Sequence, residues 1–136
     1  MQIHFVDSTH ETNFARFKEK YGFRDGDRDR TILFYLLAAL ELNEYRLADV
    51  IEDKPEGGFR LRNDVLRHDW LTSGDAKIIR LAYNCCTWDV ATVPADSPTR
   101  TKNKEMVNYM PINLFTGLDS RLGEAAREAI RLLMVM

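Results

Sequence analysis

The chain has 136 residues, 21 acidic and 19 basic side chains, and a formal net charge of −2. A chain of this length predicts one domain that buries its own core without disulfides or metals as supports. The near-neutral charge excludes a general electrostatic affinity for nucleic acid or for anionic membranes.

The first predicted helix begins at Ser8. Ser8 and Glu11 have the S-x-x-E spacing of a capping box, in which the two side chains cap the first turn. From His10 to Tyr21, aromatic rings recur at steps of four, three and four, so they share one face of the helix. Gly22 ends the helix. His10 belongs to the apolar face, which favours a partly buried core histidine over a metal ligand.

Residues 24–30 form a run of mixed charge whose alternating aspartates look like the start of a calcium-binding EF-hand loop. The pattern fails further along, because Arg30 stands where the loop needs a glycine and Leu36 where it needs a glutamate. We therefore expect solvated charges, with Asp27 or Asp29 capping the next helix.

The segment 31–42 contains ten apolar residues out of twelve and no glycine or proline, which predicts a buried central helix. At ~1.5 Å per residue it spans about 18 Å, too short to cross a bilayer core of ~30 Å. Residues 43–52 continue as a helix, with Leu47, Val50 and Ile51 on one face and acidic residues on a solvated face.

Residues 55–58, Pro-Glu-Gly-Gly, break the chain, and 59–62 alternate apolar and basic residues as in a short strand or an extended loop. A short helix is expected over 65–70. The next helix begins after Ser73, its expected N-cap, and is predicted to pack beside the central helix. Its apolar face contains Ile78, Ile79, Leu81, Ala82, Cys85 and Cys86.

Residues 89–108 show no periodicity and predict a polar loop, which at that length is either functional or disordered. Asp119 is expected to cap the last helix. The apolar stripe of this helix keeps regular steps of four and three, and consists of Leu118, Leu122, Ala125, Ala129, Leu132 and Met136. The whole pattern predicts an all-α single domain over residues 1–136, with about five helices and at most one short strand.

Three groups of residues resemble a known family. They are Phe5-Val6-Asp7 with His10-Glu11-x-Asn13-Phe14, Thr72-Ser73-Gly74 with Ile79-Arg80-Leu81-Ala82-Tyr83-Asn84, and Leu114-Phe115-x-x-Leu118-Asp119. The family comprises small uncharacterised proteins, a domain of unknown function, from Gram-positive bacteria and their phages. The resemblance covers most of the chain and implies one helical domain in a phage or prophage context. It supplies no catalytic residue, and the chain departs from it at Cys85-Cys86.

No catalytic constellation, metal site or cofactor is predicted. Cys85 and Cys86 are adjacent, so they do not face one another, and their place near the end of a buried helix favours a role as core thiols. The three histidines are scattered without the spacing of a zinc site. With no signal peptide in the first residues, we expect a cytoplasmic protein, in the cytosol of a bacterial host.

Two candidate binding sites emerge from the sequence. The first is the helix N-terminus at residues 72–75, where free N–H groups attract anions. A nucleotide-like anion would bind there through Thr72, Ser73, Gly74, Lys77 and Arg80. The second is the basic, aromatic-edged part of the long loop, with Arg100, Lys102, Lys104 and Tyr109 as partner-binding residues. An ordinary capped helix and an ordinary solvated loop are the structural alternatives.

The sequence therefore favours a non-enzymatic binding protein of phage or prophage type. Its expected action is to modulate or inhibit a host system, such as host defence, by binding a host protein. The alternative is a small-ligand protein that holds or sequesters a nucleotide-like anion at residues 72–75. A homodimer through the last helix is a further prediction, because its apolar stripe runs to the end of the chain.

Overall fold

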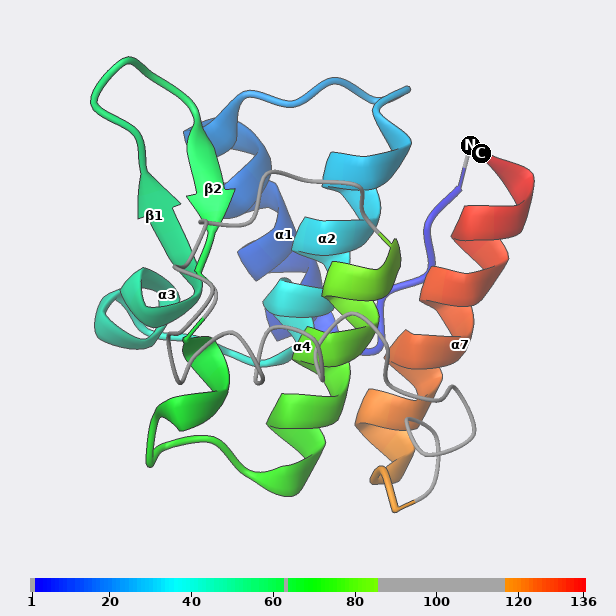
Figure 1. The fold of residues 1–136 in the computed structure, drawn as a ribbon. Coiled ribbons are helices and arrows are strands. Elements are labelled where there is room, and N and C mark those ends of the chain that lie inside the picture. Colours follow the sequence, from blue (N-terminus) through cyan, green and yellow to red (C-terminus); the bar gives the residue numbers. More distant parts are fainter. Residues whose placement is uncertain (1, 63, 86–116) are drawn as a thin grey trace.

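In the computed structural model, residues 2–62, 64–85 and 117–136 are described (Figure 1). They form five α-helices, one 3₁₀ turn and a two-stranded sheet, which confirms the predicted all-α class. In chain order the elements are α1 (Ser8–Tyr21), α2 (Arg28–Ala39), α3 (Glu44–Val50), β1 (Ile51–Asp53), β2 (Phe59–Leu61), η1 (Val65–Arg67), α4 (Ser73–Cys85) and α7 (Ser120–Val135).

Helix α2 is the centre of the core. Every residue from Thr31 to Ala39 is at most 3% exposed, so the helix is apolar and buried on all sides, as predicted. Figure 1 shows α2 between α1 and α4, with α7 alongside α2 and α4. These three helices bury their apolar faces on α2, and this burial is the main favourable contribution to folding.

Both ends of α2 differ from the predicted range 31–42. The Asp27 carboxylate accepts a hydrogen bond from the Arg30 N–H at 3.1 Å, so the helix begins at Arg28. It ends at Ala39, because Glu41 has a φ of 55° and the left-handed conformation stops the helical ladder. The chain therefore turns before α3 instead of continuing into it, and Asn43 caps the new helix.

Two predicted caps were wrong by one residue. At α1, the Asp7 carboxylate accepts from the His10 N–H at 2.8 Å, so Asp7 and not Ser8 is the N-cap. At α4, the Thr72 hydroxyl accepts from the Asp75 N–H at 3.0 Å, and Ser73 is the first helical residue. The predicted cap of α7 is confirmed, since Asp119 accepts from the Leu122 N–H at 2.8 Å.

The sheet is a short antiparallel hairpin that covers one end of the core. Ile51 pairs with Leu61, and Asp53 pairs with Phe59. Of the two alternatives for residues 59–62, a short strand or an extended loop, the structure has the strand, whereas the helix expected through residue 52 ends at Val50 and gives way to β1. The short helix expected over 65–70 is reduced to the single turn η1.

Helix α7 closes the core with the predicted apolar stripe. The buried members are Leu122, Ala125, Ala129 and Leu132, and the half-buried ones are Leu118 and Met136. The N-terminal segment lies beside the last turns of α7, where the Arg131 guanidinium donates to the Gln2 carbonyl at 2.8 Å (Figure 1). Within the described ranges, no helix is long and apolar enough to span a bilayer.

Candidate functional site

An exposed aromatic and basic surface lies on α3 and on the segment that follows β2. The Tyr45 side chain is 86% exposed, which is unusual for a large aromatic residue. The Arg46 guanidinium carbon lies 5.3 Å from the centre of the Trp70 ring, a cation–π contact. Tyr45 and Arg46 precede Asp49 by four and three residues, so the three side chains share one face of α3.

The Asp49 carboxylate holds this surface in one arrangement. Its Oδ2 atom accepts a hydrogen bond from the Trp70 indole N–H at 2.8 Å. The same oxygen lies 3.4 Å from the His68 ring nitrogen Nδ1. Two rings from one loop are thus fixed against α3 before any partner arrives. We refer to Tyr45, Arg46, Asp49, His68 and Trp70 together as the α3 surface.

Sequence reasoning missed the α3 surface. The acidic residues of 43–52 indicated a solvated face, and Trp70 falls at the end of the short helix expected over 65–70. Trp70 instead lies half-exposed and reaches a residue 21 positions earlier in the chain. One local signal was present, because Tyr45 and Arg46 lie outside the helical face that buries Leu47 and Val50.

The predicted anion site at the start of α4 is occupied by the protein's own groups. The Thr72 hydroxyl and the Asp75 carboxylate cap each other's backbone N–H groups, at 3.0 and 3.1 Å. The Asp75 charge lies where an anion would bind, and like charges repel. A Cβ atom at Gly74 would stand 3.1 Å from the Leu122 Cδ1 atom, so glycine here permits close packing of α4 on α7.

The basic residues assigned to that site have other environments. The Lys77 ammonium lies beside Gly117, ahead of α7, and the Arg80 side chain is half-buried. Both side chains already interact with other groups of the protein. The structure therefore does not gather Lys77 and Arg80 around a free helix end, and anion binding stays a prediction without geometric support. The predicted partner-binding residues Arg100, Lys102, Lys104 and Tyr109 lie outside the described residues.

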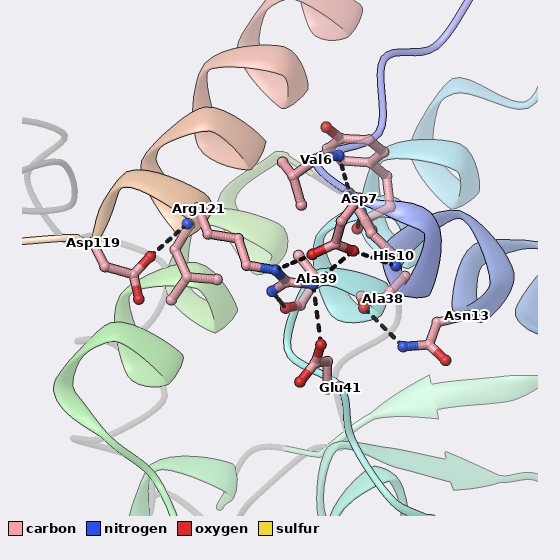
Figure 2. A network of polar contacts seen from close by, with 11 residues as sticks. Val6, Asp7, His10, Asn13, Ala38, Ala39, Glu41, Asp119 and Arg121 are labelled. Carbon is pink, nitrogen blue, oxygen red and sulfur yellow. Dashed lines mark hydrogen bonds and ion pairs between the residues drawn. The ribbon is translucent and has the colours of Figure 1, made fainter.

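Arg121 is the centre of a polar network that joins three elements (Figure 2). Its Nε atom lies 2.7 Å from the Asp7 carboxylate, which caps α1. It also donates to the Ala39 carbonyl at the end of α2, and its Nη2 atom lies 3.3 Å from Glu41. A cation at a helix C-terminus is favourable because the last carbonyls are negative. The pair with Arg121 thus lies at the residue whose left-handed conformation follows the end of α2.

Arg121 lowers the pKa of Asp7, and burial keeps the imidazole of His10 neutral. The Arg121 guanidinium beside Asp7 lowers the pKa of that carboxyl to about 2. His10 is fully buried, and burial lowers the pKa of its imidazole below 6.5. Because these groups are bonded to one another and connect the ends of helices, we assign them a structural role.

The titratable nucleophiles of the described residues are not activated. Burial raises the pKa of the Cys85 thiol to about 11, which agrees with its predicted role in the core. Burial also raises the pKa of the Tyr35 and Tyr83 hydroxyls. In the part of the chain that the structure describes, no group of three or more His, Cys, Asp or Glu residues is placed to hold a metal ion.

Comparison with known proteins places the chain in a family but assigns it no activity. No curated protein matches the chain, and no solved structure matches it. One family model, described as a family of unknown function (DUF6075), matches residues 1–132, which is almost the whole chain. Because the match covers the helices, the sheet and the α3 surface alike, the chain belongs to this family of unknown function.

Proposed function

We propose that this chain is a non-enzymatic binding protein and that it binds another protein through the α3 surface. The observation that carries the proposal is an exposed tyrosine beside a stacked arginine and tryptophan. These three residue types are enriched among the few residues that dominate the binding energy of protein interfaces. They are conspicuous here because the core does not need the Tyr45 or Arg46 side chains, both of which are exposed.

Pre-organisation supports the same proposal. A side chain that is already held in its bound conformation loses less entropy when a partner arrives. The Asp49 carboxylate holds the Trp70 indole by a hydrogen bond of 2.8 Å, and Arg46 covers the face of the ring. A partner would therefore meet an ordered tryptophan and arginine. Tyr45 would be the side chain that inserts into the partner.

We further propose that the partner is a host protein and that the chain acts in a phage or prophage setting. In this proposal the chain modulates or inhibits a host system such as host defence. The motif resemblance supports the phage setting. The raised pKa values of the Cys85 thiol and of the Tyr35 and Tyr83 hydroxyls support binding rather than catalysis.

Affinity capture from a bacterial host lysate tests the proposal, with the folded protein as bait. We expect a specific partner to be recovered by the wild type and by Met134→Ala, and to be lost with Tyr45→Ala. Met134 is a matched control because it is 80% exposed but lies on α7. Measured with the purified partner, Tyr45→Ala should weaken Kd by about tenfold or more. Recovery of no specific partner, or equal binding by both variants, would contradict the proposal.

A further inference from the structure

A pocket of about 280 Å³ lies between α1 and the start of α3. Its floor is apolar and consists of Phe17, Leu42 and Leu47. Phe17 and Leu47 are buried, and Leu42 is half-buried, so the floor is the outer edge of the core. The volume is just below the ~300–1,000 Å³ typical of ligand sites. It provides room for one large side chain.

One rim of the pocket is positively charged. Arg16 and Lys20 line it from α1, and both side chains are exposed. They are four residues apart, so they stand on one face of α1, where like charges repel. Neither forms an ion pair with any residue that the structure describes. The rim therefore has two positive charges that no described carboxylate neutralises, although the Lys20 ammonium lies 5.3 Å from the centre of the Tyr21 ring.

The opposite rim has the other sign. Glu44, in the first turn of α3, lines the pocket across from Arg16 and Lys20. An acidic group in the pocket would be attracted to α1 and repelled from α3. The charges therefore fix the direction in which a charged partner segment can lie.

We propose that this pocket receives an apolar side chain of the partner protein, with a neighbouring carboxylate paired to Arg16 and Lys20. The inference rests on the proposed function, because it takes the occupant of the pocket to be a segment of the same partner protein. Glu44 and Leu47 line the pocket, while Tyr45 and Arg46 between them belong to the α3 surface. The two sets of residues face different sides of α3, so the acidic and apolar segment in the pocket would be distinct from the part of the partner that contacts Tyr45.

Selection of displayed random dodecapeptides on the purified protein tests the inference. We expect the enriched peptides to place Asp or Glu within two positions of Leu, Ile, Phe or Trp. Their binding should weaken about tenfold in the double variant Arg16→Glu/Lys20→Glu, and weaken with added salt. Glu44→Lys should bind them more tightly, because it removes the repelling charge.

The matched control is Arg24→Glu/Arg127→Glu, which reverses two exposed charges away from the pocket and should leave binding unchanged. Circular dichroism verifies that each variant is folded. Enrichment of basic peptides, survival of binding in Arg16→Glu/Lys20→Glu, or no enrichment would each overturn the inference. The inference would also be overturned if decanoate displaced the peptides and bound as tightly as they do, since this would indicate a fatty-acid site. If binding of the partner requires Tyr45 but is unchanged in Arg16→Glu/Lys20→Glu, the inferred role of the pocket is wrong and the proposed function is unaffected.

Discussion

The buried side chain of His10 forms its two hydrogen bonds only in the neutral form. Its Nδ1 atom lies 3.2 Å from the Val6 backbone nitrogen and accepts that N–H. Its Nε2 atom lies 2.8 Å from the Tyr35 carbonyl oxygen and therefore carries the proton that is donated there. A proton on Nδ1 would oppose the Val6 N–H and leave a charge in the core. The neutral tautomer is thus part of the connection between the N-terminal segment and α2.

This arrangement predicts that the protein loses stability in mild acid. Burial lowers the pKa of His10 below 6.5 in the folded state, so the unfolded chain takes up a proton first. The contribution of neutral His10 to the free energy of unfolding is fully present above about pH 6.5. It is lost as the pH decreases toward the folded-state pKa. Urea unfolding at about pH 7.5 and about pH 5.5 measures the loss.

The variant His10→Gln serves as the control for this titration. It has no charge to gain, so its free energy of unfolding should change less between the two pH values, although it is less stable at both. The pKa of Asp7, lowered to about 2 from 3.8, lowers stability only in stronger acid. An unchanged wild-type stability between the two pH values, or an equal slope in the variant, would contradict the role assigned to His10.

At the scale of elements, the sequence predicts which helices form better than where they begin. Asp7 and Ser8 both favour an N-cap, as do Thr72 and Ser73, so local preference leaves two registers open. Contacts distant in the chain decide between them. Arg121 binds the Asp7 carboxylate from 114 positions away, and this pair is invisible to a local pattern.

The cap of α4 predicts different effects on stability for substitutions at the neighbouring residues Thr72 and Ser73. Thr72→Ala removes the hydroxyl that accepts the Asp75 N–H, and should lower the free energy of unfolding by about 1 kcal/mol. Ser73→Ala removes a hydroxyl from the first helical residue and should change stability by less than about 0.5 kcal/mol. Thermal or urea unfolding of the two variants measures the difference. A larger effect at Ser73 than at Thr72 would show that Ser73 is the N-cap after all.

A local sequence pattern does not show contacts between distant residues, and this also explains what was missed at the sheet and at the candidate site. Ile51 to Asp53 fit either a helix or a strand locally, and β1 forms because Phe59 to Leu61 pair with them. Trp70 reaches Asp49 only after that hairpin reverses the chain. Glu41 is not a glycine, yet it has a φ of 55°, and it pairs with Arg121 from 80 positions away. Surfaces built from distant residues therefore appear only in the structure.

For the molecule as a whole, the strongest prediction from sequence was the core itself. The run of apolar residues after Arg30 had to be covered, and the regular stripe of the last helix was available to cover it. Polar contacts reinforce this closure, because Glu128 accepts the His4 N–H at 2.9 Å and pairs with Arg131 at 2.6 Å. The stripe that suggested a homodimer is therefore used within one chain, and a dimer would have to use other residues of α7.

The exposed apolar residues at the end of α7 are the remaining basis for that dimer. Met134 is 80% exposed and Val135 is 53% exposed. If they hold two chains together, Met134→Ser/Val135→Ser should convert a dimer to a species of 15.8 kDa in light scattering, with little change in melting temperature. A wild type that already has this mass at high concentration ends the dimer prediction.

Deletion of residues 132–136 makes the complementary test, and here we expect loss of the fold. The deletion removes Leu132, which is fully buried, and uncovers the core around α2. Loss of one buried leucine costs about 2–5 kcal/mol, a large part of the ~5–15 kcal/mol that stabilises a small domain. The melting temperature should therefore fall steeply in the truncated chain and stay close to wild type in Met134→Ser/Val135→Ser. A truncated chain that melts like the wild type would show that α7 is not needed to close the core, and that its stripe is free to bind a second molecule.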